Sequence, residues 1–184
     1  MENKKIGLFV GSLRKESFNL KFAKHIQAVA PEGYQMEIIE IGHLPFYNED
    51  IDNGNPPQSY TDFRNTVASL DGLLFFTPEY NRSVPGVLKN AIDVASRPYG
   101  ANVWGGKPAA VLSSSIGNIA GFGANHHLRQ SLVFVDVPVM AQPEVYLGNA
   151  GSLFNDAGEL TDAGCRGFLD EFLTAFTQWV ERFN

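Results

Sequence analysis

The sequence predicts one α/β domain, residues 1–184, built on a doubly wound parallel sheet of five strands. Short apolar runs alternate along the chain with longer segments whose apolar residues recur at helical spacing. The middle runs are continuously apolar, which is typical of strands that helices cover on both faces. No internal repeat or low-complexity tract divides the 184 residues, of which 44% are apolar and 18% charged, so one packed core is expected.

The positions of strands and helices follow from these two patterns. Strands are expected at residues 4–10, 35–41, 72–77 and 108–114, with a weaker fifth strand at 138–140. Helices are expected at residues 19–29, 60–69, 86–96, about 121–134 and 162–182. This strand–helix–strand rhythm implies right-handed crossovers, and it places ligands beyond the carboxyl ends of the strands.

Two further segments have a structural interpretation. Aromatic residues in the last helix recur at spacings of three and four, which predicts a face in the core and not a cofactor site. They are Phe168, Phe172, Phe176 and Trp179. The polar stretch 48–59 is expected to be a long connection within the domain, with Glu49, Asp50 and Asp52 exposed to solvent.

Charge and cysteine content exclude several classes of protein. Acidic residues outnumber basic ones by 20 to 14, giving a net charge of -6, whereas a nucleic-acid or membrane-surface binder needs clustered Lys and Arg.

Cys165 is the only cysteine, so no intrachain disulfide can form, and a structural or surface role is favoured over a redox role. The apolar stretch near the N-terminus is too short for a signal peptide, so a cytoplasmic protein is expected.

The histidines do not indicate a metal site. His126 and His127 are neighbours on a predicted helix, where their side chains diverge and cannot chelate one metal ion together. His25 and His43 lie elsewhere in the sequence. We therefore expect no metal ligands in this chain.

The first loop with functional potential, residues 11–19 (G-S-L-R-K-E-S-F-N), follows the first strand. It matches neither a Walker A loop nor the G-x-G-x-x-G turn of dinucleotide-binding domains. Ser12, Ser17 and Asn19 offer hydrogen-bond donors, and the start of the next helix offers free N–H groups. Arg14 adds a positive charge, and together these groups suit a terminal phosphate monoester. Alternatively Ser17 or Asn19 only caps the helix, but a cap requires neither Ser12 nor Arg14.

The second loop, residues 77–86 (T-P-E-Y-N-R-S-V-P-G), follows the third strand. Pro78 and Pro85 restrict its backbone and make it stiff. A stiff loop can present N–H groups to the polar edge of a flat heterocycle, and Tyr80 adds an aromatic surface. Taken alone, the loop fits this interpretation and that of an ordinary rigid turn before a helix equally well.

The third loop, residues 113–121 (S-S-S-I-G-N-I-A-G), follows the fourth strand. Its small residues allow a ligand to approach the backbone closely. It is not the nucleophile elbow of a serine hydrolase, because the first glycine of G-x-S-x-G is missing.

Taken together, these motifs resemble one family. G-S-L-R-K-E-S-F-N, P-E-Y-N and the following V-P-G-V-L-K-N-A-I-D are similar to the NADPH-dependent FMN reductase family, and within it to the bacterial quinone and chromate reductases. G-G-K-P at 105–108 and H-L-R-Q at 127–130 extend the resemblance over most of the chain. The combined pattern is specific, whereas any one piece alone is not.

The resemblance implies a flavodoxin-like three-layer sandwich that binds FMN and uses NADPH or NADH as electron donor. In the family, the first loop binds the FMN phosphate, and the second and third loops border the isoalloxazine ring. The matching phosphate residues are Ser12, Arg14, Ser17 and Asn19. The matching ring residues are Pro78, Glu79, Tyr80 and Asn81, with Ser115 and Gly117 at the other edge. Family members are usually dimers or tetramers, so a homodimer or homotetramer is implied.

The function expected from this resemblance is an NAD(P)H oxidoreductase. Hydride passes from NAD(P)H to bound FMN, and two electrons then pass to a quinone-like, azo or metal-oxyanion acceptor. Such a reaction needs no side-chain nucleophile, and none is indicated by the sequence. Two alternatives stay open: a flavodoxin-type protein that exchanges single electrons with partner proteins, and an FMN reductase that releases free reduced FMN.

Two positions depart from the resemblance. Arg82 follows P-E-Y-N where close relatives often have an aromatic residue, which bears on the character of the substrate cleft. A-G-F-G at residues 120–123 stands where relatives tend to carry a glycine pair and a nearby arginine. This second departure bears on nicotinamide access, on NADPH-over-NADH preference or on subunit contacts.

Overall fold

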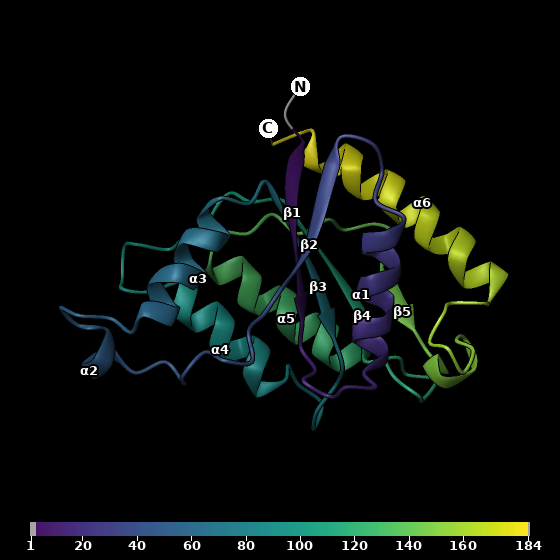
Figure 1. The fold of residues 1–184 in the computed structure, drawn as a ribbon, viewed down its shortest axis with the longest axis horizontal. Coiled ribbons are helices and arrows are strands. Elements are labelled where there is room, and N and C mark those ends of the chain that lie inside the picture. The colour runs from purple at the N-terminus through teal and green to yellow at the C-terminus, as the bar shows by residue number, and fades with distance from the viewer. Residues whose placement is uncertain (1–2, 184) are drawn as a thin grey trace.

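The computed structural model describes residues 3–183, and their core is a five-stranded sheet in the order β2-β1-β3-β4-β5 (Figure 1). The strands are β1 (Lys4–Val10), β2 (Tyr34–Ile39), β3 (Gly72–Thr77), β4 (Ala109–Ser114) and β5 (Val145–Leu147). Every neighbouring pair is parallel. The predicted doubly wound α/β fold is therefore confirmed.

Helices cover both faces of this sheet (Figure 1). They are α1 (Phe18–Ala28), α2 (Glu49–Asp52), α3 (Gln58–Ala68), α4 (Gly86–Ala95), α5 (Phe122–Phe134) and α6 (Ala163–Val180), with a short 3₁₀ turn, η1 (Ala150–Ser152). One buried cluster joins α1 and α6 to the sheet, and a second joins α3, α4 and α5 to the opposite face. The chain thus forms three layers. Among the described helices, none is long and apolar enough to cross a membrane.

Burial on both faces explains the continuous apolar runs of the strands. Every residue of β3 is buried. Phe75 belongs to the cluster beneath α3, α4 and α5, whereas its neighbours Leu74 and Phe76 belong to the cluster beneath α1 and α6. Both side-chain directions of the strand therefore require apolar residues.

The aromatic stripe of α6 packs as predicted. Phe172 and Phe176 are fully buried, and Phe168 and Trp179 are partly buried against the same cluster. Trp179 also donates a hydrogen bond from Nε1 to the carbonyl oxygen of Pro138 (3.1 Å). The stripe is the core-facing side of the helix.

The predicted fifth strand at 138–140 is wrong. Val139 makes only an isolated bridge to Ala109, and β5 instead comprises Val145–Leu147, which pairs with residues 112–114. An edge strand of 3 residues is too short to give a periodic signal in the sequence. The strand was predicted at 138–140 because these residues are apolar, but Val139 and Met140 are apolar because they pack into the core and not because they extend the sheet.

The expectation that Asp52 is exposed is also wrong. The stretch 48–59 contains the short helix α2, in which Asp52 is buried, with 7% of its surface exposed. Its two carboxylate oxygens accept hydrogen bonds from Nη1 and Nη2 of Arg64, each 2.8 Å long. Arg64 also donates from Nε to the carbonyl oxygen of Val94 (2.9 Å), so the pair joins α2, α3 and α4. Glu49 and Asp50 are exposed, as expected.

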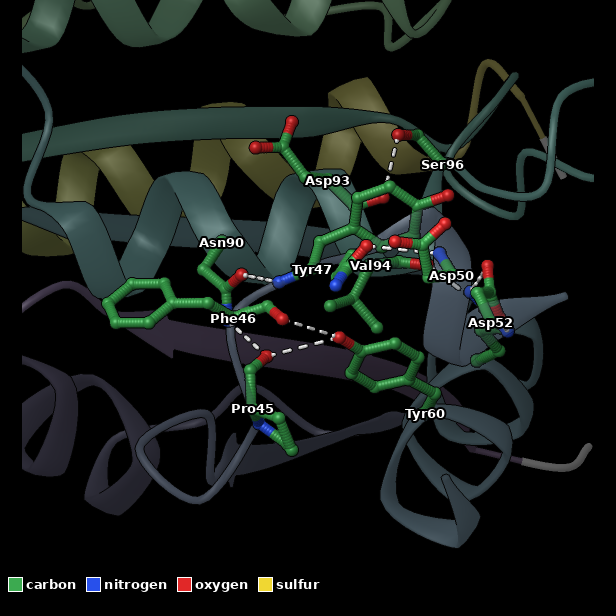
Figure 2. Close-up of polar contacts among 12 residues, drawn as sticks. Pro45, Phe46, Tyr47, Asp50, Asp52, Tyr60, Asn90, Asp93, Val94 and Ser96 are labelled. Carbon is green, nitrogen blue, oxygen red and sulfur yellow. Dashed lines mark hydrogen bonds and ion pairs between the residues drawn. The ribbon is translucent and has the colours of Figure 1, made fainter. Parts of the chain in front are cut away.

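The chain between β2 and α2 is held against α3 and α4 by hydrogen bonds (Figure 2). Asn90 accepts from the backbone N–H of Tyr47 (2.7 Å) and donates to the carbonyl oxygen of Pro45 (2.9 Å). The Tyr60 hydroxyl donates to the carbonyl oxygen of Phe46 (2.9 Å). This long connection is therefore fixed by buried polar side chains from the neighbouring helices.

Candidate functional site

The strand order reverses between β1 and β3, because the chain passes from β1 to β2 on one side and returns to β3 on the other. Loops that leave β1, β3 and β4 all emerge at the carboxyl ends of these strands, along the lower edge of the sheet in Figure 1. In open parallel sheets such a reversal opens the crevice in which ligands bind. The structure thus brings the three predicted loops to one end of the molecule.

The first and second loops touch directly at Gly11. Its backbone N–H donates to the carbonyl oxygen of Phe76 (2.8 Å). A Cβ on Gly11 would lie 3.2 Å from Leu88 Cδ2 and 3.3 Å from Pro78 Cδ, closer than most real Cβ contacts. The absence of a side chain at Gly11 therefore lets the two loops approach without displacing Leu88 or Pro78.

Ser17 is the N-cap of α1. Its backbone is extended, and its Oγ accepts a hydrogen bond from the N–H of Leu20 (3.3 Å). Ser17 therefore caps α1. The cap uses Oγ as an acceptor, so the hydroxyl proton of Ser17 can still be donated to a ligand at the helix N-terminus.

The other predicted phosphate residues keep their donors free. Ser12 and Asn19 are buried, with 8% and 4% of their surfaces exposed, whereas Arg14 is exposed. Within residues 3–183, none of these three side chains has a hydrogen-bond or ion-pair partner. A cavity of about 250 Å³ lies beside Ser12 and Arg14, lined by residues 12–15 and by the carboxyl end of β2. A hydroxyl, an amide and a guanidinium beside a helix start match the donors that a phosphate monoester requires.

The second loop forms a tight turn that is tied to α5. Tyr80 and Ser83 exchange backbone hydrogen bonds of 3.1 and 3.0 Å. The Glu79 carboxylate, whose side chain is 12% exposed, accepts from Arg82 Nη1 (2.9 Å) and from the N–H of Ala124 (3.1 Å). Tyr80 is 47% exposed, Asn81 is exposed and Pro78 is half-buried. The loop therefore presents the Tyr80 ring and backbone groups, while Glu79 holds the loop in place.

The third loop is fixed to the segment after β5. Ser115 donates its backbone N–H to Leu147 (3.1 Å) and accepts at its carbonyl oxygen from Ala150 (3.0 Å). Its Oγ accepts from the N–H of Gly117 (3.0 Å), which shapes the turn. Gly117 is exposed, so its backbone is open to a ligand that approaches the carboxyl edge.

Ser114 is a residue that the sequence interpretation missed. It ends β4, it is 3% exposed, and its Oγ has no hydrogen-bond partner within the described residues. A buried hydroxyl without a partner is rare and indicates a place for a polar ligand atom or water. The run of serines at 113–115 was visible, but the strand register that buries Ser114 and frees its hydroxyl was not.

The donor set therefore fits FMN. Free phosphate donors lie at the start of α1, an unpartnered hydroxyl lies at the end of β4, and exposed apolar surface surrounds them. The exposed apolar side chains near these loops are Leu13, Tyr80, Ile116, Ile119 and Phe122. A flat aromatic ring with a phosphorylated tail needs this combination of polar and apolar contacts.

The two histidines of α5 lie within hydrogen-bond distance of neighbouring hydroxyl groups. His126 Nε2 lies 3.0 Å from the Tyr146 hydroxyl, which donates to Glu144 (2.9 Å), whereas His127 Nδ1 lies 3.1 Å from Ser83 Oγ. Burial, together with the hydrogen bond to Glu144, raises the pKa of Tyr146 to about 12. The two histidine side chains thus diverge, as predicted.

Cys165 lies at the start of α6, on the face of the sheet opposite α5. Its N–H donates to the capping carboxylate of Asp162 (2.7 Å). Burial raises the pKa of its thiol to about 11, so the thiol is neutral at physiological pH and a poor nucleophile. The geometry gives it no part in the carboxyl-edge site.

Comparison with known proteins gives a consistent result. The NADPH-dependent FMN reductase family matches residues 4–152. A quinone reductase of Pseudomonas putida is 56% identical over 96% of this chain and 94% of its own. The structure of FerB, a flavoenzyme NAD(P)H:(acceptor) oxidoreductase from Paracoccus denitrificans, is similar with a TM-score of 0.90 and 40% identity over 98% of both chains. A mutant flavodoxin from Pseudomonas aeruginosa shares the fold alone, with a TM-score of 0.56 and 17% identity over 94% of this chain and 99% of its own.

Proposed function

This chain belongs to the NADPH-dependent FMN reductase family, and we propose that within it the protein is a two-electron reductase of quinone-like acceptors. It is an oxidoreductase that uses FMN and NAD(P)H. FMN, when bound, supplies the chemistry: it accepts hydride from NAD(P)H and passes electrons to the acceptor. The observation that carries the proposal is the set of donors at the start of α1, beside the strand-order reversal, that have no partner among the residues that the structure describes.

Each loop has a distinct binding role in this proposal. Ser12, Arg14 and Asn19, with Ser17 and the N–H groups of α1, would hold the phosphate. Pro78, Glu79, Tyr80 and Asn81 would border one edge of the ring, and Ser115 and Gly117 the other edge. The chain's part in the reaction is then to bind and orient the reactants, and the contacts among the loops provide the necessary rigidity.

Quinones are the acceptors best supported, because the relative with 56% identity is named a quinone reductase and spans nearly the whole chain. Azo compounds and metal oxyanions are proposed as further acceptors of the same two-electron step. NADPH and NADH are both proposed as donors. We also propose that the chain is a single cytoplasmic domain.

A homodimer or homotetramer is proposed from the exposed apolar surface. Val133 and Phe134 at the end of α5 are 74% and 84% exposed, and Tyr99 after α4 is 90% exposed. A groove of about 660 Å³ runs between α4 and α5, and Phe134 lines it. Apolar surface of this kind is typical of an interface between subunits. Light scattering coupled to gel filtration measures the subunit number directly.

The test of the function begins with the purified holoenzyme. We expect FMN to stay bound through gel filtration, NADPH and NADH to bleach the flavin absorbance anaerobically, and a quinone to restore it. Loss of FMN on the column, combined with reduction of added free FMN, would identify an enzyme that releases reduced flavin. Exchange of single electrons with a protein partner, without turnover of any quinone, would identify an electron-transfer protein.

A further inference from the structure

The turn after β3 places a charged residue in an unfavourable backbone conformation. Asn81 and Arg82 have φ angles of 51° and 64°, in the left-handed region. Asparagine tolerates this region, but arginine does so at a cost that glycine would avoid. Contacts elsewhere must therefore hold Arg82 in place.

Glu79 provides that contact and is itself anchored to α5. Its Oε1 accepts from Arg82 Nη1 (2.9 Å), and its Oε2 accepts from the N–H of Ala124 (3.1 Å). A Cβ on Gly123 would lie 2.9 Å from Glu79 Oε2 and 3.3 Å from the carbonyl oxygen of Arg82. The absence of a side chain at Gly123 thus allows Glu79 and Arg82 to dock on the start of α5.

The negative charge of Glu79 does not fully neutralise the positive charge of Arg82, because Glu79 also interacts with the N-terminus of α5. The first turn of α5 carries no acidic residue, and the partial positive charge of the helix N-terminus takes up part of the negative charge of Glu79. The Arg82 side chain is 72% exposed, whereas the Glu79 side chain is 12% exposed. Nε and Nη2 of Arg82 have no partner within the described residues. A cationic group with free N–H donors therefore faces solvent on the second loop.

Exposed aromatic side chains lie on the same turn as Arg82 and at the start of α5. Tyr80, two residues before Arg82, is 47% exposed, and Phe122, at the start of the helix to which the turn is docked, is 50% exposed. A planar ligand with one ionised oxygen suits such a surface: its ring covers apolar side chains, and its oxygen accepts from the guanidinium.

We propose that Arg82, positioned by Glu79 and Gly123, selects acceptors that carry a negative charge, such as quinones with an ionised hydroxyl or carboxyl group, over neutral quinones. This proposal rests on the proposed function, because the acceptor must reach the site bordered by the second loop. Arg82 is a specificity residue, and the electron transfer itself does not depend on it.

The test compares two quinones of similar shape, 1,4-naphthoquinone and the anionic 2-hydroxy-1,4-naphthoquinone, with the holoenzyme and NADPH. The measured quantity is the ratio of kcat/KM for the anionic quinone to kcat/KM for the neutral one. An exposed charge contact is worth up to about 1 kcal/mol, so Arg82→Gln should lower the ratio about fivefold at low salt. Arg82→Lys should keep the ratio within about twofold of wild type, because the charge remains.

Lys24→Gln is the matched control. Lys24 is an exposed cation on α1, so its replacement removes the same net charge away from the second loop and should leave the ratio unchanged. A binding measurement without turnover complements the kinetics: calorimetric titration of the holoenzyme with 1-hydroxy-2-naphthoate, a planar anion that is not a quinone. Its Kd should rise about fivefold in Arg82→Gln and stay within about twofold in Lys24→Gln.

The outcomes separate the two proposals. An unchanged ratio in Arg82→Gln, or an equal loss for both quinones, overturns the selector role and leaves Arg82 with a structural role in the turn. A wild-type enzyme that reduces neither quinone overturns the proposed function. Arg82-dependent binding of the naphthoate in such an enzyme would still support the anion site on its own.

Discussion

The first loop and the connection 48–59 are both polar in sequence, yet their polar side chains have different roles. In the connection, the buried Asp52 is paired with Arg64 through two hydrogen bonds of 2.8 Å. In the first loop, Ser12 and Asn19 are equally buried but have no side-chain partner within residues 3–183. Their polar atoms still reach solvent, because Ser12 and Asn19 are not among the described residues with a fully buried, unpartnered side-chain polar atom, so their donors stay available to a ligand. A paired polar cluster thus indicates a structural joint, whereas an unpaired cluster at a strand-order reversal indicates a ligand site.

The largest effect should come from breaking the paired cluster. Asp52→Ala leaves Arg64 without its counter-charge, and its side chain is only 13% exposed. Loss of one partner from a buried ion pair lowers the free energy of unfolding by about 3–5 kcal/mol. Urea denaturation of the apoprotein measures this loss, and Asp50→Ala, at an exposed neighbour, is the control. FMN affinity should change less than twofold, and a large fall in affinity without loss of stability would reverse the roles assigned to the two regions.

The next effect should come from the unpaired cluster. Arg14→Ala removes one charge-assisted contact to the FMN phosphate, which should weaken FMN binding by about 1.5–3 kcal/mol, or about 10- to 150-fold in Kd. Stability of the apoprotein should not change, because Arg14 has no ion pair within the described chain. Quenching of flavin fluorescence during titration measures the Kd, and Lys24→Ala, at an exposed cation on α1 outside the loop, is the control. Equal affinities in wild type and Arg14→Ala would remove Arg14 from the phosphate site.

The sequence predicted the features that depend on local pattern. The long strands and helices appear within a few residues of their expected positions, because their apolar spacing reflects burial against the sheet. The three loops were found because parallel strands place their carboxyl ends at one edge. The short strand β5 was missed because 3 residues give no period.

Features that depend on distant partners were not visible in the sequence. Asp52 was expected in solvent because Arg64, 12 residues later, pairs with it only after α3 folds over α2. Glu79 was assigned to the ring by resemblance, and only the structure shows that its carboxylate docks on Ala124, 45 residues away. The need for a glycine at position 123 likewise follows from its contacts with Glu79 and Arg82 in the folded chain.

A smaller effect is expected at the end of β4, where the unpaired hydroxyl of Ser114 lies next to the paired hydroxyl of Ser113. Ser114→Ala removes a buried hydroxyl that has no partner in the described part of the chain, so apoprotein stability should be unchanged or slightly higher. If the hydroxyl serves FMN, the affinity should fall by about 0.5–1.5 kcal/mol, or about 2- to 12-fold. Ser113→Ala is the opposite control, because its Oγ accepts from Asn125 (3.2 Å) and its loss should destabilise the apoprotein. Unchanged FMN affinity in Ser114→Ala would mean that water, and not the cofactor, satisfies this hydroxyl.

His25 provides the smallest effect and tests whether every unpartnered buried group indicates a ligand. Its Nε2 is buried on α1, away from the carboxyl edge of the sheet, and has no partner among residues 3–183. Burial lowers the pKa of His25 below the ordinary value of 6.5, with Arg166 acting in the same direction and Asp170 opposing both. In the folded protein, His25 therefore binds a proton only at a lower pH than it does in the unfolded chain.

The sign of the pH dependence follows from this difference in pKa. Stability from the neutral His25 is fully present above 6.5 and is lost as the pH falls below that value, because the unfolded state then binds the additional proton. Wild type should lose more stability between about pH 7.5 and about pH 5.5 than His25→Gln does. FMN affinity should be equal in the two proteins, because His25 lies on α1 and interacts with Arg166 and Asp170 of α6 and not with the loops. Urea denaturation at both pH values measures the slope, with His43→Gln, at an exposed histidine, as the control. An identical slope in wild type and His25→Gln would show that other groups cause the acid sensitivity, and weaker FMN binding in His25→Gln would extend the ligand site into the helix layer.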